Sequence, residues 1–183
     1  ARMVSGNFFK GYGARVLIGR PITPEDDRPG APPVAVLTYP IWQRVFGLDP
    51  QVIGRTLTVG KTGFTVIGVL PRRYVGPLVG ERRADFYVPL TAQRQLLPYE
   101  RWLEKDNAWW VQMMGRLAPG VSPSQAQSEM DALTAALEAE HPEENEGIGV
   151  RLEPLKEAWF GKLRFGLLFL LGGACILLVI ACI

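Results

Sequence analysis

The sequence predicts an α+β fold that leads into the start of a transmembrane helix. Three observations predict it. Residues 56–69 alternate polar and apolar side chains around a Gly-Lys-Thr-Gly turn, the pattern of a β-hairpin. Residues 122–125 read Ser-Pro-Ser-Gln, a capping box that opens a helix running to about residue 140. The last 17 residues, 167–183, carry no charge.

The N-terminal third predicts two short helices and a buried strand. Residues 5–13 predict a helix capped by Ser5, with its aromatic side chains facing inward. Residues 20–33 are rich in proline and predict a loop. The apolar run 34–37 predicts a buried strand, and residues 38–46 predict a helix with Thr38 as its cap and Pro40 in its first turn.

The next segment predicts the hairpin, with a four-residue connection over 60–63, and then a second long loop. Residues 71–84 are rich in Arg, Gly and Pro. Residues 85–90 predict a short strand, in which Pro89 favours a sheet edge or a strand end. Residues 91–107 are polar and predict partial helix.

Residues 109–155 predict a β-α-β unit. Alternating patterns favour strands at 109–117 and 149–155, on either side of the capped helix. One face of that helix carries apolar side chains at helical spacing, namely Ala126, Met130, Leu133 and Leu137. This face is expected to point into a core.

Residues 167–183 predict a membrane span. With Phe165 and Gly166 the charge-free run is 19 residues, about 28 Å of helix against a hydrocarbon core of about 30 Å. A buried core helix is the alternative. Residues 156–166 would form the approach to the membrane, and the side chains predicted for the stalk and membrane interface are Lys156, Trp159, Phe160, Lys162 and Arg164. We expect the chain to be an internal segment of a longer protein.

The charge balance excludes some classes of protein. The net charge is +2, yet residues 1–155 hold 17 basic and 17 acidic side chains. A neutral body argues against nucleic-acid binding, which needs a basic stripe to neutralise phosphates. Four arginines, Arg72, Arg73, Arg82 and Arg83, flank a Gly-rich loop. They are candidate contacts to anionic headgroups or to a partner protein, and a solvated loop is the alternative.

Chemistry-bearing motifs predict neither an enzyme nor a cofactor site. His141 is the single histidine, so no nucleophile, base and orienting group can be assembled around it. The sequence Gly60-Lys61-Thr62 resembles the end of a Walker A loop, but Arg55 stands where that motif needs glycine. The adjacent carboxylates Asp26 and Asp27 are either a cation site or solvated. We therefore predict no catalytic residue, no metal and no cofactor.

Several segments together resemble one known family. The sequence is similar to the MacB-like periplasmic core domain of FtsX-like ABC transporter permeases, and its loops resemble those of large orphan permeases with duplicated permease units. The order and spacing of the segments carry the resemblance: 4–9 (VSGNFF), 19–21 (GRP), 23–27 (TPEDD), 34–37 (VAVL), 42–44 (WQR), 49–50 (DP), 52–55 (VIGR), 64–69 (FTVIGV), 88–90 (VPL), 115–122 (GRLAPGVS) and 125–127 (QAQ).

The resemblance implies a two-lobed extracytoplasmic domain. Residues 1–90 would be the inserted, β-rich, sabre-like lobe, and residues 91–106 a connector. Residues 107–155 would be one β-α-β half of the porter-like lobe, whose other half is expected upstream of this chain. Residues 156–166 would be the stalk, and residues 167–183 a truncated transmembrane helix.

The resemblance also implies function, partners and location. It implies a permease without its own ATPase site, in which a separate cytoplasmic ATPase drives efflux or transmits motion across the membrane. The implied partners are that ATPase, a second permease copy, the lipid bilayer and a periplasmic adaptor, and not nucleic acid. Residues 1–155 would lie outside the bacterial inner membrane.

Two observations keep an alternative open. A single-pass membrane-anchored sensor or binding module would also carry a folded domain before one apolar span. Against the orientation that the resemblance implies, Lys156, Lys162 and Arg164 precede the span, and basic flanks usually stay cytoplasmic. A membrane-tethered enzyme is the weakest alternative, because no catalytic set can be assembled.

Overall fold

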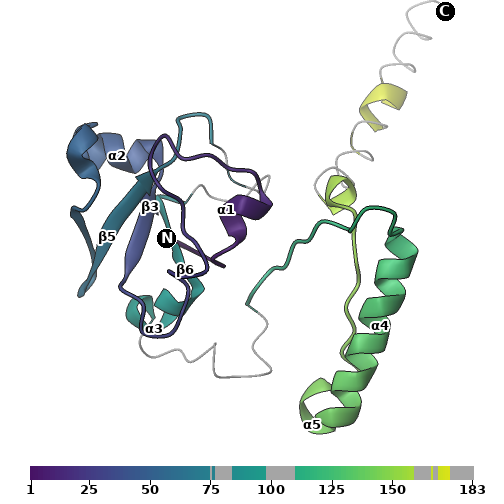
Figure 1. The fold of residues 1–183 in the computed structure, drawn as a ribbon. Helices are drawn as coiled ribbons and strands as arrows, with labels where there is room; N and C mark the ends of the chain where they lie inside the picture. The colour runs from purple at the N-terminus through teal and green to yellow at the C-terminus, as the bar shows by residue number, and fades with distance from the viewer. Residues whose placement is uncertain (75, 77–83, 98–109, 159–165, 167–168, 174–183) are drawn as a thin grey trace, which may run out of the picture. The chain divides into compact units, whose positions relative to one another are not determined.

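The computed structural model describes residues 1–74, 76, 84–97, 110–158, 166 and 169–173. The chain divides into two compact units, Ala1–Arg116 and Leu117–Ile183, hereafter unit 1 and unit 2 (Figure 1). Sheet and helices occur together, which confirms a mixed α and β fold.

Unit 1 is built on a mixed sheet with six strands among its described residues. The order is β1-β6-β3-β5-β2. β4 also pairs with β5, along its first half, whereas β2 pairs with the last two residues of β5. β1 runs parallel to β6, and β3 runs parallel to β5, while β3 and β6 are antiparallel. The strands are β1 (Arg2–Val4), β2 (Ile18–Gly19), β3 (Val34–Leu37), β4 (Thr56–Val59), β5 (Thr62–Val69) and β6 (Phe86–Pro89).

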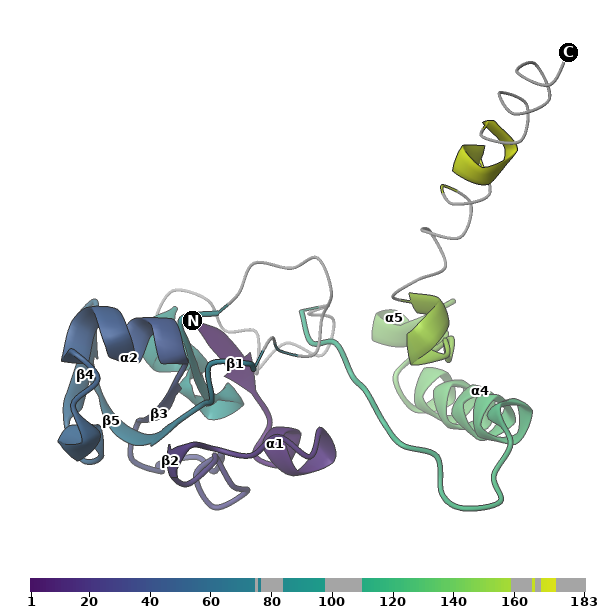
Figure 2. The ribbon, with the colours of Figure 1, turned by 90° about the horizontal axis from the view of Figure 1, so that it is seen from above.

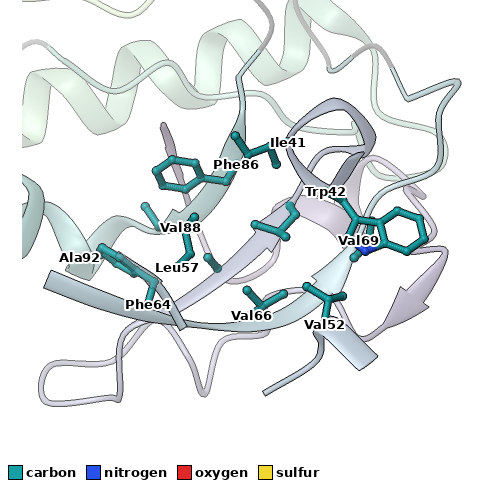
Figure 3. Packing of buried hydrophobic residues seen from close by; sticks show 12 residues of the cluster. Ile41, Trp42, Val52, Leu57, Phe64, Val66, Val69, Phe86, Val88 and Ala92 are labelled. Atoms are coloured by element: carbon teal, nitrogen blue, oxygen red, sulfur yellow. The ribbon is translucent and has the colours of Figure 1, made fainter. Parts of the chain in front are cut away.

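Both faces of this sheet are covered. On one face α2 (Tyr39–Phe46) packs with the segments η1 (Pro50–Val52) and η2 (Leu90–Ala92), and α3 (Gln93–Leu96) follows η2. Figure 3 shows Trp42 of this cluster beside Val69. On the other face α1 (Phe8–Gly11) and the following loop cover a second cluster (Figure 2). All four residues of β3 are buried, as predicted from its unbroken apolar run.

The predicted helices of unit 1 are present, but their caps differ from prediction. Ser5 does not cap α1; its hydroxyl donates to the Asn7 side chain at 2.7 Å. Thr38 precedes α2 as predicted, yet its hydroxyl donates to the Asp85 carbonyl at 2.7 Å. In both cases the side chain has a tertiary or local partner that outcompetes the helix N-terminus.

The hairpin is confirmed with a shorter turn than predicted. Val59 pairs with Thr62, so the connection is Gly60-Lys61 and not four residues. Gly60 takes φ +62°, the left-handed conformation that two-residue hairpin turns need. Pro89 is the last residue of β6, which lies between β1 and β3, so the proline marks a strand end and not a sheet edge.

The acidic pair in the predicted loop 20–33 is neither solvated nor placed as a cation site. Asp26 accepts two hydrogen bonds from the Arg20 guanidinium, at 2.6 and 2.8 Å, and one from the Thr23 amide at 2.9 Å. The hydrogen bonds from Arg20 lower the pKa of the Asp26 carboxyl. Its oxygens are therefore already engaged by protein donors.

Asp27 closes the end of the parallel pair β1 and β6. One carboxylate oxygen accepts from the Gly6 amide at 3.0 Å, and the other accepts from the Thr91 amide at 3.0 Å. Val4 pairs with Pro89, so Gly6 and Thr91 lie at the same level just past the last ladder pair. A single side chain thus satisfies the amides of two diverging strands.

Gly6 is required at this junction for a steric reason. A Cβ built on Gly6 would lie 2.5 Å from the Pro24 Cα. Only glycine lets the loop approach closely enough for Asp27 to reach the Gly6 amide.

Unit 2 contains the long helix that the capping box predicts. α4 runs from Pro123 to Glu140, and Ser122 and Gln125 make both capping hydrogen bonds. A short helix, α5 (Pro142–Asn145), follows. Glu138 on α4 accepts from the Gly147 amide at 3.0 Å, where the chain turns back.

The two strands predicted to flank this helix are not observed. Within the described residues, neither 110–117 nor 149–155 belongs to a ladder. The apolar face of α4 is also largely open, because Leu133 and Leu137 are 51% and 42% exposed while Ala126 is buried. Alternation alone does not make a strand, which also needs a neighbour to receive its backbone hydrogen bonds.

Among the described residues, no helix is both long and apolar enough to cross a bilayer. Most of the predicted span lies outside those residues. The described part, 169–173, is helical, and Phe169, Leu170 and Leu171 are 82%, 73% and 63% exposed.

Replacing Asp27 with alanine is expected to destabilise unit 1. The change strands two backbone amides at the end of β1 and β6, which corresponds to about 3 kcal/mol in the free energy of unfolding. Urea unfolding followed by tryptophan fluorescence measures it. The matched control is Glu25→Ala, an exposed carboxylate of the same loop, which should leave the urea midpoint unchanged. Equal midpoints for the two variants would refute the role of Asp27.

Candidate functional site

The arginine-rich turn after β5 is the first candidate surface. Arg72 and Arg73 follow the strand directly and are both exposed. The Arg72 guanidinium lies over the Tyr39 ring, 6.0 Å from its centroid, at the outer limit of a cation–π contact. Arg82 and Arg83, predicted to share this surface, lie outside the described residues.

Aromatic packing anchors this turn to the sheet. The Tyr74 amide donates to the Pro71 carbonyl at 2.9 Å, and the Tyr74 ring meets the Tyr87 ring edge-on at 5.9 Å between centroids. Phe8 and Phe9 of α1 also contact Tyr87. Burial raises the pKa of both the Tyr74 and Tyr87 phenols. Aromatic packing therefore holds the turn that carries Arg72 and Arg73 against the sheet.

The predicted stalk is described only at its start. Residues 155–158 form one helical turn, in which the Glu157 and Ala158 amides donate to the Pro154 carbonyl. Lys156 is exposed on this turn. The other four predicted interface residues, Trp159, Phe160, Lys162 and Arg164, lie outside the described residues.

Residues 149–154, hereafter the return segment, lead toward this stalk and are held by one side chain of α4. The Gln127 amide group donates to the Val150 carbonyl at 2.7 Å and accepts from the Leu152 amide at 2.7 Å. This two-bond pattern copies the pairing of a β-ladder. Sequence reasoning missed this role of Gln127, because its two partners lie 23 and 25 residues away along the chain.

Groups with catalytic or metal-binding potential are not gathered in the described residues. No cluster of three or more His, Cys, Asp or Glu side chains occurs there. His141 is exposed between α4 and α5, where its carbonyl accepts from the Asn145 amide at 3.1 Å.

The chain matches the model of one family. The model of the MacB-like periplasmic core domain matches residues 1–133. The chain belongs to this family. Its members are periplasmic domains of ABC-type transporter permeases. No curated protein matches the chain.

Three solved structures align with the chain, and the first of them shares its fold. The periplasmic region of MacB from Actinobacillus actinomycetemcomitans aligns with a TM-score of 0.50 and 18% identity, over 78% of this chain and 57% of that one. A permease protein domain from Porphyromonas gingivalis aligns at 0.43 and 19%, over 83% and 66%. The extracellular domain of the noncanonic ABC-type transporter YknZ from Gram-positive bacteria aligns at 0.39 and 19%, over 51% and 44%. The chain thus spans less than two thirds of each.

Replacing Gln127 should release the return segment. In Gln127→Ala both hydrogen bonds are lost, and hydrogen exchange at the Leu152 amide should speed up about tenfold, the equivalent of one net hydrogen bond. Gln127→Glu still accepts from Leu152 but cannot donate to Val150, so its effect should be smaller. Ser128→Ala, next to it on α4, is the control. Unchanged exchange in Gln127→Ala would contradict the assigned role.

The tyrosine anchor should make unit 1 sensitive to alkaline pH. The folded-state pKa of Tyr74 is raised, so its stabilising effect is complete below the unfolded pKa of about 10 and is lost as pH rises above it. Thermal unfolding between about pH 9 and pH 11 measures this. Tyr74→Phe, which cannot ionise, should lose less stability over that interval. Parallel curves for the two proteins would exclude the effect.

Proposed function

We propose that this chain is the extracytoplasmic part and first following membrane segment of an ABC transporter permease. A separate cytoplasmic ATPase would supply the energy, and the permease would convert it into movement of a substrate across or out of the membrane. The match of the MacB-like periplasmic core domain to residues 1–133 carries this proposal. Residues 1–155 would then lie outside the bacterial inner membrane.

The proposed organisation follows the family. Residues 1–90 form the sabre-like lobe and residues 91–106 the connector. Residues 107–155 form one half of a porter-like lobe, residues 156–166 the stalk, and residues 167–183 a transmembrane helix.

The exposed segments on either side of α4 support the porter-like half. Val111, Met113 and Leu152 are 38–82% exposed, on the segments 110–117 and 149–154, which have alternating patterns. A second β-α-β half would supply the missing strand neighbours and a cover for the open face of α4. Under this proposal the two segments are strands that lack their neighbours, and the sheet forms when its other half is present.

The mechanism is mechanical. The return segment is pinned to α4 by Gln127 and runs within a few residues into the turn at 155–158. A displacement of the membrane helix would therefore be passed through the stalk to α4. The partners of this mechanism are the ATPase, a second permease copy, the bilayer and a periplasmic adaptor.

Breaking the stalk tests the proposal. In the proposed stalk helix, Leu163→Pro would remove a backbone hydrogen bond and place a ring against the preceding turn, which costs a helix interior about 3 kcal/mol. In proteoliposomes containing the permease and its ATPase, this variant should hydrolyse ATP without transport. Leu163→Ala keeps the helix and should remain coupled. Coupled transport in Leu163→Pro would refute the proposal.

A further inference from the structure

Charge is strongly segregated between the two units. The body of the chain, residues 1–155, is neutral as a whole, but the boundary between Arg116 and Leu117 divides it unequally. Residues 1–116 carry 16 basic and 9 acidic side chains, a net charge of +7. Residues 117–155 carry 1 basic and 8 acidic side chains, a net charge of −7. An average over the sequence conceals this division.

The negative charge concentrates at the turn from α4 to α5. We define the acidic tip as Glu140, Glu143, Glu144 and Glu146, all of which are exposed. No basic side chain occurs between residues 117 and 150. Within the described part of the chain, every salt bridge lies in unit 1, and the acidic tip takes part in none. These carboxylates have no cation nearby along their own helices.

Three exposed arginines of unit 1 lie at one end of its sheet. The Leu17 amide donates to the Val69 carbonyl at 2.7 Å, and Ile18 pairs with Val69 in the antiparallel register. Residues just before Leu17 and just after Val69 therefore lie at the same end of the sheet. We define the arginine rim as Arg15, Arg72 and Arg73, which are exposed there.

The arginines of the rim are not paired with carboxylates. Among the described residues, the acidic side chain at this end is that of Asp85. Its backbone carbonyl accepts from the Thr38 hydroxyl, and its carboxylate is already paired with Arg44 at 3.1 Å. None of the three rim arginines has a carboxylate within 4.0 Å among the described residues. Three uncompensated guanidiniums thus face solvent beside the exposed Leu17.

We propose that the arginine rim of one copy docks on the acidic tip of a second copy of this chain. The inference rests on the proposed function, which places two permease copies in one membrane. Because the two surfaces are complementary and occur in the same chain, a two-fold dimer forms the contact twice, rim to tip and tip to rim. The opposite and equal charges of the two units favour a second copy over a partner of either sign.

Charge reversal tests the contact in the full chain in detergent. The rim variant is R15E/R72E/R73E, and the tip variant is E140K/E143K/E144K. Sedimentation velocity should show that each variant self-associates about tenfold more weakly than the unchanged protein at about 10 mM salt. An equimolar mixture of the two variants should restore association as a heterodimer, since each supplies the surface that the other has lost.

The controls keep the result specific. K10E/K61E/R116E changes the net charge by the same amount at exposed cations outside the rim, and should associate like the unchanged protein. Circular dichroism verifies that each variant is folded. Unchanged association in both reversed variants, or a mixture that forms no heterodimer, would overturn the proposal.

Two further outcomes are distinguished from the main one. If the rim variant loses binding to vesicles containing phosphatidylglycerol while its self-association is unchanged, the rim binds lipid and the proposal is wrong. The proposed function is tested by coupling of ATP hydrolysis to transport, which is a separate readout. A permease that remains coupled but lacks salt-sensitive association refutes the docking contact alone.

Discussion

The carboxylate of Asp27 is the constraint on which the architecture of unit 1 depends. β1 and β6 run parallel, so their chains leave the same end of the sheet with amides that have no further ladder partner. Asp27 accepts from both, at Gly6 and Thr91. The proline-rich loop is thereby tied to two segments that are far apart in sequence. A Cβ at position 6 would collide with Pro24, so the hydrogen bond from the Gly6 amide to Asp27 depends on glycine at that position.

The extended segments of this chain are stabilised in two different ways. In unit 1, β3 has strands on both sides and is buried on both faces. The segments 110–117 and 149–154, on either side of α4, carry comparable alternation but have no strand beside them among the described residues. One of them is held by the side-chain amide of Gln127 in place of a backbone neighbour. Under the proposed function, such a segment would pass displacement between α4 and the stalk.

Local patterns predicted much of the fold because their causes are local. The capping box at Ser122 predicted the start of α4 to the residue, since both of its hydrogen bonds are made within four residues. The hairpin was predicted for the same reason, although its turn proved to be Gly60-Lys61 alone. The roles of Asp27 and Gln127 were not predictable, because their partners are distant in sequence. Thr38 shows the same limit, since Asp85 takes the hydroxyl that was expected to cap α2.

By itself, the sequence determined the buried strand, the principal helices, the hairpin, the family and the charge-free run at the C-terminus. These depend on residue type and on spacing within a few positions. Only the tertiary structure decided which carboxylates are structural, where a strand obtains its neighbours, and where the chain divides into a positive and a negative unit. Those properties depend on which distant segments meet, and a hydrogen bond or charge pair across a fold leaves no periodic trace in the chain.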